Sequence, residues 1–175
     1  MNLPNKLTTM RIILIPFFMV FLMFGYKWVA AIIFIAASFT DYLDGHIARK
    51  YNLVSNFGKI MDPLADKLLV AAALLCLVQL GHLPGWMAFI ILGRELLIVS
   101  LRAVAASEGI VIAASKWGKV KTVSQMVAIV LMLIGNWPFG WEGFPLAMII
   151  MWIAVILTVI SGVDYVVKNK EVFLG

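Results

Sequence analysis

The stretch D-Y-L-D-G-H-I-A-R, residues 41–49, is followed by G-K-I-M-D-P-L-A-D, residues 58–66, and both stand between apolar runs. Together they contain four of the nine acidic residues of this 175-residue chain: Asp41, Asp44, Asp62 and Asp66. Carboxylates are costly at bilayer depth, and proteins usually keep them there for ions, protons or catalysis. This concentration of acids therefore requires a chemical explanation.

The composition around these acids excludes an ordinary soluble domain. Apolar residues make up 63% of the chain and charged residues 13%, against about 45–50% and about 25% in typical domains. The apolar residues also fall in long runs, which is typical of an integral membrane protein. Cys76 is the single cysteine and lies in such a run. It is expected to be a small core residue, because the chain offers it no disulfide partner.

Six apolar runs each approach the roughly 20 residues that a helix needs to cross the hydrocarbon. They cover about residues 12–26, 28–43, 63–80, 85–107, 120–137 and 145–167. Continuous runs favour helices over strands, because lipid excludes unpaired strand edges. Residues 2–10 are expected to form a short interfacial helix that starts near Pro4. The predicted fold is therefore all-α, with six transmembrane helices.

We expect residues 1–175 to form a single membrane domain. Its predicted parts are an interfacial segment over 1–11, a six-helix bundle over 12–167 and a cytoplasmic tail over 168–175.

The positive charges predict which way the chain crosses the membrane. The first, third and fifth connectors between runs carry Lys27 as their one Lys or Arg. The other side carries eleven: Lys6, Arg11, Arg49, Lys50, Lys59, Lys67, Lys116, Lys119, Lys121, Lys168 and Lys170. The positive-inside rule therefore places both termini in the cytoplasm. The charges cluster at the ends of apolar runs, so the net charge of +5 favours contacts with lipid or substrate phosphates over nucleic acid.

Helical spacing gives the four acids a geometry. The acids of the first pair are three residues apart and those of the second pair four, so each pair shares one helix face. Antiparallel neighbouring helices would bring the two pairs together. Four such carboxylates repel one another, and oxygen ligands without nearby His or Cys suit Mg²⁺ or Mn²⁺. The alternative is that the acids merely pair with Arg49, Lys59 and Lys67 at a wet helix end.

The residues beside the acids favour a nucleotide ligand. Gly45 and Gly58 lie inside helical patterns, where glycine often indicates the close approach of another group. Ala48 is also small, and Arg49 can donate two parallel hydrogen bonds to a pyrophosphate. Pro63 suits the first turn of a helix, so it is expected to mark the start of the third span.

The combined pattern D-x-x-D-G-x-x-A-R and G-x-x-x-D-x-x-x-D resembles the signature of the CDP-alcohol phosphotransferases. Its fixed positions are all present, as Asp41, Asp44, Gly45, Ala48, Arg49, Gly58, Asp62 and Asp66. The signature covers 26 residues, and the six-span layout extends the resemblance over nearly the whole chain. The resemblance implies an enzyme that binds two Mg²⁺ or Mn²⁺ ions per site and that forms a homodimer.

The resemblance also implies roles for individual residues. The implied metal ligands are Asp41, Asp44, Asp62 and Asp66, of which Asp66 would also accept the proton of the acceptor hydroxyl. The residues implied in nucleotide binding are Asn5, Lys6, Leu7, Thr8, Gly45, Ala48, Arg49, Ser55 and Gly58. Within that set, Gly45 and Ala48 would make room for the cytidine, and Arg49 would bind the pyrophosphate.

A second cationic group points to the acceptor alcohol. Arg94, Glu95 and Arg102 interrupt the fourth apolar run. An ion pair between Glu95 and Arg102 is the structural alternative, and it leaves Arg94 unexplained. The segment S-K-W-G-K-V-K-T, residues 115–122, adds three lysines, and positive-inside topology explains some of them. Thr122 is expected to begin a helix, and a helix N-terminus with nearby lysines resembles an anion-binding site. The predicted acceptor-phosphate site comprises Arg94, Arg102, Lys116, Lys119, Lys121 and Thr122.

These segments, and the opening N-L-P-N-K-L-T-T-M-R, resemble the bacterial phosphatidylglycerophosphate synthases within the same family. That resemblance implies transfer of a phosphatidyl group from CDP-diacylglycerol to sn-glycerol 3-phosphate, giving phosphatidylglycerol phosphate and CMP for phospholipid biosynthesis. It implies the bacterial cytoplasmic membrane, with the active site facing the cytoplasm among membrane lipids. Serine, inositol phosphate or a phospholipid remain open as acceptors. An ion-coupled transporter is a more distant alternative, because an ion path needs acids spread through the membrane depth.

Overall fold

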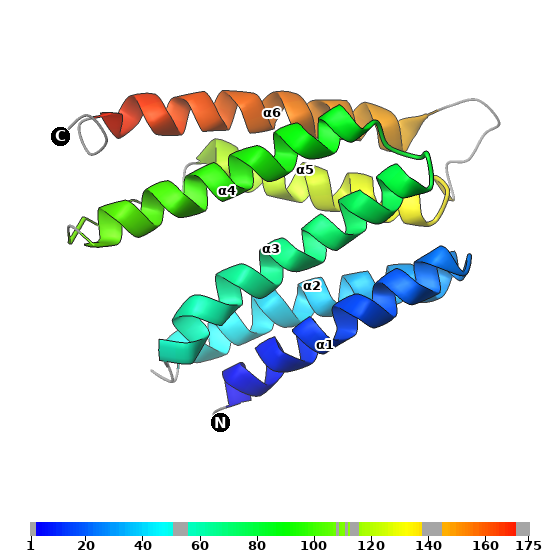
Figure 1. The fold of residues 1–175 in the computed structure, drawn as a ribbon, viewed down its shortest axis with the longest axis horizontal. Coiled ribbons are helices and arrows are strands. Elements are labelled where there is room, and N and C mark those ends of the chain that lie inside the picture. The colour runs from blue at the N-terminus through cyan, green and yellow to red at the C-terminus, as the bar shows by residue number, and fades with distance from the viewer. Residues whose placement is uncertain are drawn as a thin grey trace. The chain divides into compact units, whose positions relative to one another are not determined.

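The computed structural model describes residues 3–50, 56–107, 109–110, 112, 116–137 and 145–170. This described part contains six α-helices and no strand, which confirms the predicted all-α class (Figure 1). In chain order they are α1 (Leu3–Met23), α2 (Lys27–Lys50), α3 (Asn56–Gln79), α4 (Gly85–Ser107), α5 (Lys116–Leu133) and α6 (Leu146–Lys168).

The helices form two compact units. Unit 1, Met1–His82, contains α1, α2 and α3, and unit 2, Leu83–Gly175, contains α4, α5 and α6. In unit 1, α1 packs against both α2 and α3, and α2 also contacts α3. In unit 2, α6 packs against both α4 and α5.

Unit 1 is held together by one buried stripe on each helix. On α1 the buried residues are Asn5, Thr8, Arg11, Ile15, Phe18 and Leu22. They recur every three or four residues, so they share one helix face. The Phe18 ring meets the Phe34 ring of α2, with 5.8 Å between centroids. Fully buried alanines, such as Ala37 of α2 and Ala73 of α3, allow the helices to approach closely.

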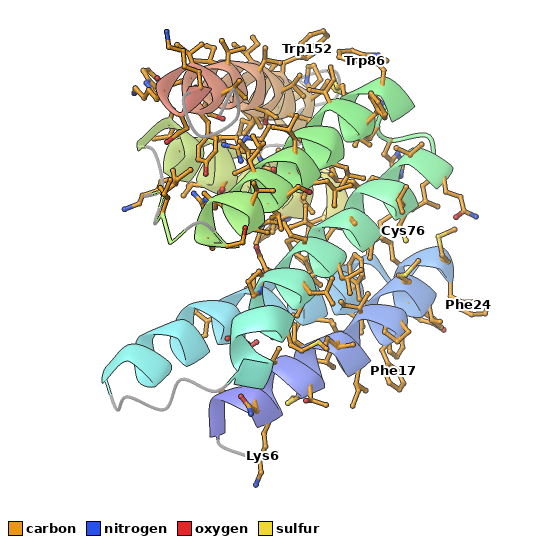
Figure 2. All side chains as sticks on the ribbon, turned by 60° about the vertical axis from the view of Figure 1, so that its left-hand side comes forward. Lys6, Phe17, Phe24, Cys76, Trp86 and Trp152 are labelled. Atoms are coloured by element: carbon orange, nitrogen blue, oxygen red, sulfur yellow. The ribbon has the colours of Figure 1, made fainter. Side chains whose placement is uncertain are left out.

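Unit 2 carries polar residues in its buried stripes. On α6 the buried face runs through Met151, Ala154, Thr158, Ser161 and Tyr165. The Thr158 hydroxyl donates to the Ala154 carbonyl and the Ser161 hydroxyl to the Thr158 carbonyl, so both are satisfied within the helix. Near the start of α4 and within α6, the ring centroids of Trp86 and Trp152 lie 5.2 Å apart (Figure 2).

The distribution of polar and apolar side chains is the reverse of that in a water-soluble protein. Phe24 and Phe89 are each 77% exposed, whereas the charged Arg11 and Lys121 are each 1% exposed. Apolar surface on this scale is typical of contact with lipid. Two helical segments, Asn5–Met23 and Leu146–Lys168, are long and apolar enough to cross a membrane. In α4, Arg94, Glu95 and Arg102 interrupt the apolar sequence.

Three predicted helix boundaries are wrong. α1 is continuous from Leu3 to Met23, so residues 3–10 form its first turns and not a separate interfacial helix. α3 begins at Asn56, which leaves Pro63 inside the helix. α5 begins at Lys116, so Thr122 does not begin it. In each case the helix extends beyond the apolar run, because backbone hydrogen bonding continues through polar residues as well.

Candidate active site

Asp62 is oriented by a hydrogen bond from the first helix. It lies on the packed face of α3, four residues after the buried Gly58 and three before the buried Ala65. The fully buried Thr8 of α1 donates its hydroxyl to Asp62 Oδ1 at 2.5 Å. The bond joins the predicted nucleotide-contacting segment to a signature acid 54 residues later. Asp62 itself is partly exposed.

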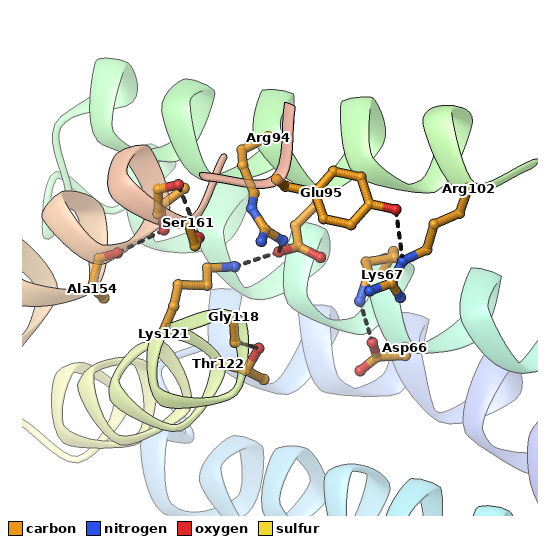
Figure 3. Close-up of polar contacts among 12 residues, drawn as sticks. Asp66, Lys67, Arg94, Glu95, Arg102, Gly118, Lys121, Thr122, Ala154 and Ser161 are labelled. Atoms are coloured by element: carbon orange, nitrogen blue, oxygen red, sulfur yellow. Dashed lines mark hydrogen bonds and ion pairs between the residues drawn. The ribbon is translucent and has the colours of Figure 1, made fainter. Parts of the chain in front are cut away.

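Asp66 lies one turn further along the same face of α3. Its Oδ2 is 2.5 Å from Nζ of Lys67, and the two side chains are each 31% exposed (Figure 3). The sequence left open the alternative that the acids pair with nearby lysines, and Asp66 does form such a pair, with Lys67. An ion pair this exposed contributes little to stability. Separating Asp66 from Lys67 therefore costs little free energy.

The first pair of acids lies on α2, in a part where the structure describes the helix but not the side chains. The buried residues Ala30, Phe34 and Ala37 of α2 are separated by four and three residues. Positions 41 and 44 continue that series by four and three along the helix. The predictions for Gly45, Ala48 and Arg49 fall on the same undescribed side chains, and Ser55 lies outside the described residues altogether.

The N-terminal segment divides between a buried and an exposed face. Asn5 and Thr8 are buried, Leu7 is half-buried, and Lys6 is exposed and points away from the helices (Figure 2). Arg11, whose charge was expected to act as a topology signal, is buried. Arg11 is three residues after Thr8 on the same stripe, so helical spacing could have predicted its burial. A buried cation needs compensating negative charge or polar groups.

In unit 2, two cations converge on one carboxylate. Lys121 of α5 places Nζ 2.5 Å from Glu95 Oε1, and Arg94 places Nη1 3.2 Å from the same oxygen (Figure 3). Glu95 and Lys121 are buried, and the Arg94 side chain is 14% exposed.

The ion pair weighed between Glu95 and Arg102 is not formed. Arg102 Nε instead donates to the Tyr165 hydroxyl at 3.3 Å, with its guanidinium 5.6 Å from the centre of that ring. Seven residues place the two side chains on one face, but also about 10 Å apart along the axis. Glu95 and Arg102 therefore share a helix face without contacting each other.

The remaining predicted acceptor residues lie elsewhere on α5. Lys119 is exposed, and Thr122 is exposed with its hydroxyl donating to the Gly118 carbonyl at 2.9 Å. The side chain of Lys116 is not described. Of the predicted acceptor set, the described structure thus gathers Arg94 and Lys121 around Glu95 and leaves Lys119 and Thr122 on other faces of α5.

Asp62 and Asp66 are the described candidates for metal ligands in unit 1. Asp62 and Asp66 offer carboxylate oxygens from successive turns of one helix, and oxygen donors suit a hard divalent cation. Within the described residues, no group of three or more His, Cys, Asp or Glu side chains converges. The described pair therefore fits part of such a site, with Asp41 and Asp44 as the predicted remainder.

Comparison with known proteins identifies the family. The model of the CDP-alcohol phosphatidyltransferase family matches residues 1–160. The CDP-diacylglycerol–glycerol-3-phosphate 3-phosphatidyltransferase of Bacillus subtilis is 47% identical, over 97% of this chain and 96% of its own. The Rickettsia felis protein of the same name is 38% identical, over 98% and 97%. A probable phosphatidylglycerophosphate synthase of Mycobacterium tuberculosis is 42% identical, over 95% and 81%. The chain belongs to the CDP-alcohol phosphatidyltransferase family, whose members generally depend on a divalent metal.

Proposed function

We propose that this enzyme transfers the phosphatidyl group of CDP-diacylglycerol to sn-glycerol 3-phosphate, giving phosphatidylglycerol phosphate and CMP. Relatives that are 38–47% identical over nearly their full length carry that activity in their names. The structural observation that carries the proposal is the hydrogen bond from Thr8 to Asp62. It joins the N-terminal segment to the signature acids within one unit.

The transfer forms one phosphorus–oxygen bond and breaks another. A hydroxyl oxygen of glycerol 3-phosphate attacks the phosphorus that carries diacylglycerol, and the bond from that phosphorus to the CMP oxygen breaks. Asp66 accepts the hydroxyl proton, and CMP leaves with the electron pair. Asp41, Asp44, Asp62 and Asp66 would hold two Mg²⁺ or Mn²⁺ ions, which supply positive charge to the phosphoryl oxygens. Thr8 keeps the Asp62 carboxylate in one orientation.

The other residues bind the two substrates. The nucleotide set is Asn5, Lys6, Leu7, Thr8, Gly45, Ala48, Arg49, Ser55 and Gly58. The residues assigned to the acceptor phosphate are the cations Arg94 and Arg102 on α4 and Lys116, Lys119 and Lys121 on α5, together with the hydroxyl of Thr122. A phosphorylated acceptor accounts for this surplus of positive charge in an apolar chain.

We further propose that residues 1–175 act as one membrane domain with six spans. Both termini and the active site face the cytoplasm in the bacterial cytoplasmic membrane, and two copies associate within the lipid. The first turns of α1 lie at headgroup depth, which the exposed Lys6 supports.

The deciding experiment is an acceptor panel. Purified protein with CDP-diacylglycerol and Mg²⁺ receives glycerol 3-phosphate, serine, inositol phosphate or phosphatidylglycerol, and the lipid formed is identified by mass spectrometry. We expect phosphatidylglycerol phosphate and an equal amount of CMP with glycerol 3-phosphate alone. Chelation should stop the reaction, and added Mg²⁺ or Mn²⁺ should restore it. A different lipid product, or turnover that resists chelation, contradicts the acceptor or the metal assignment respectively.

Asp66→Asn separates catalysis from binding in the same assay. The amide cannot accept the hydroxyl proton, so turnover should be lost while CDP-diacylglycerol binding remains. Near-normal turnover of this variant would exclude Asp66 as the base.

A further inference from the structure

Gln125 of α5 is a buried polar residue whose amide oxygen makes no hydrogen bond. Gln125 is 2% exposed, and its Oε1 is buried without a partner in the described part of the chain. Buried polar groups are nearly always paired, so an unpaired amide oxygen indicates a missing donor. Leaving it unpaired is costly in apolar surroundings, and residues 126–133, which follow on α5, are all apolar.

The buried Thr and Ser hydroxyls of α6 do not supply this donor. Thr158 donates to the Ala154 carbonyl at 2.6 Å, and Ser161 donates to the Thr158 carbonyl at 3.1 Å. Each of these hydroxyls has a single proton to donate, and that proton is used within α6. The donor that Gln125 lacks therefore has to come from another group.

Gln125 lies one helical turn beyond the residue of α5 that reaches the acceptor cations. It follows Lys121 by four residues, so the two buried side chains share a helix face. Their Cα atoms are about 6 Å apart along the helix axis. Lys121 meets Glu95 of α4 beside Arg94 (Figure 3). The amide of Gln125 therefore adjoins the residues assigned to the acceptor phosphate.

Arg94 has an unpaired group of the complementary kind. Its Nε is buried and makes no hydrogen bond to any residue that the structure describes. A Cβ built on Gly162 of α6 would lie 3.3 Å from Arg94 Cγ, so α6 limits where this side chain can go. The interior of unit 2 thus contains one unpaired N–H and one unpaired amide oxygen. A phosphate accepts from the first, and an alcohol hydroxyl donates to the second.

We propose that Gln125 determines specificity for the acceptor, because its Oε1 accepts a hydrogen bond from the secondary hydroxyl of glycerol 3-phosphate. This inference rests on the proposed function and adds a residue to its acceptor site. Glycerol 3-phosphate has two hydroxyls, and attack by the primary one leaves the secondary one able to donate. A site that pairs with a substrate hydroxyl discriminates against an analogue without it, because the buried polar group then stays unpaired.

The test compares two acceptors that differ in this hydroxyl alone. sn-Glycerol 3-phosphate and 3-hydroxypropyl phosphate share the primary hydroxyl and the phosphate, and 3-hydroxypropyl phosphate lacks the secondary hydroxyl. Both are supplied with CDP-diacylglycerol and Mg²⁺, and the lipid product is quantified by mass spectrometry. The kcat/KM of the original protein should be about 10- to 100-fold higher for glycerol 3-phosphate.

Gln125→Met removes the amide and keeps a side chain of similar length. It should lower the kcat/KM for glycerol 3-phosphate by about 10- to 100-fold and change that for 3-hydroxypropyl phosphate by less than about threefold. The preference between the two acceptors should therefore nearly vanish. The matched control is Gln79→Met, which makes the same change at the exposed last residue of α3 and should keep the preference.

A purely structural role of Gln125 affects both acceptors alike. The proposal is therefore overturned if Gln125→Met loses activity equally with both acceptors, or if it keeps the original preference. Equal use of both acceptors by the original protein overturns it as well. If Gln125→Met does not fold in detergent, Gln125→Asn, which withdraws the amide by one methylene, decides by the same ratio. Failure of the proposed function is distinct, because the original protein would then form no phosphatidylglycerol phosphate from glycerol 3-phosphate.

Discussion

Individual buried polar side chains orient the candidate active site of this apolar chain. Thr8 and Arg11 are buried on the stripe that continues as Ile15, Phe18 and Leu22. In a lipid-facing protein, polar groups gain by facing the helix bundle, because lipid satisfies none of their hydrogen bonds. Burial of Thr8 therefore both hides its hydroxyl and directs it at Asp62.

Replacing Thr8 by valine should weaken the metal site without changing side-chain shape. Hydrogen bonds to charged groups contribute about 1.5–3 kcal/mol, which corresponds to about 10- to 100-fold in rate. Thr8→Val should therefore lower the rate of CMP release and raise the Mg²⁺ concentration needed for half-maximal activity. Thr8→Ser, which keeps the hydroxyl, should recover most of both.

The neighbouring threonine provides the control. Thr9 donates to the Asn5 backbone carbonyl at 2.9 Å, a bond within its own helix. Thr9→Val should leave the Mg²⁺ dependence unchanged. Equal losses in the Thr8 and Thr9 valine variants would show that Thr8 matters only for folding.

Sequence spacing predicted helix faces well and partners poorly. The shared face of Asp62 and Asp66 follows directly from their four-residue separation. The alternative that was weighed, a pair between Glu95 and Arg102, is not formed. Spacing along α4 contains no information about Lys121, which comes from another helix. Arg11 was counted only as a topology signal, because its charge was considered without its position on the buried stripe.

At the scale of helices, two glycines in unit 2 differ in what surrounds them. Gly162 of α6 faces Arg94 of α4 at close range, whereas a Cβ on Gly93 of α4 would meet nothing within 4 Å. Both lie inside helices, where glycine is about 1 kcal/mol less favourable than alanine. Replacement by alanine therefore tests packing against Arg94 at Gly162, and helix propensity alone at Gly93.

Gly162→Ala should displace the Arg94 stem by a few tenths of an ångström and raise the KM for glycerol 3-phosphate several-fold. Gly93→Ala should raise the unfolding temperature and leave both KM values as they are. Steady-state kinetics and thermal unfolding in detergent check the pair. Identical kinetics in the two variants would mean that α6 does not constrain Arg94.

The boundaries of the helices were less predictable than their number. Apolar runs mark the part of each helix that suits hydrocarbon, and α3 and α5 both extend into polar sequence before those runs begin. Pro63 was taken as a helix start because its missing N–H costs least there. It is tolerated in the interior of α3, as Pro16 is in α1.

At the scale of the whole molecule, the excess of Lys and Arg on the predicted cytoplasmic side remains when buried cations are left out of the count. Arg11 and Lys121 are buried within their units, so they serve packing as well as topology. Setting them aside leaves nine Lys and Arg residues on the predicted cytoplasmic side against Lys27 on the other. A bias of that size still orients a membrane protein. The two units were not predicted, because the sequence contains no linker long enough to suggest them.

The proposed six spans would place the third connector and the C-terminal end of α6 on opposite sides of the membrane. The buried Cys76 is replaced by alanine, and single cysteines are introduced by His82→Cys or Lys170→Cys, both at exposed positions. A membrane-impermeant maleimide should label position 82 in right-side-out vesicles and position 170 only in inverted ones. Labelling of both positions from one side requires an even number of crossings between them. That result would contradict the six-span topology while leaving the chemistry assigned to Asp62 and Asp66 intact.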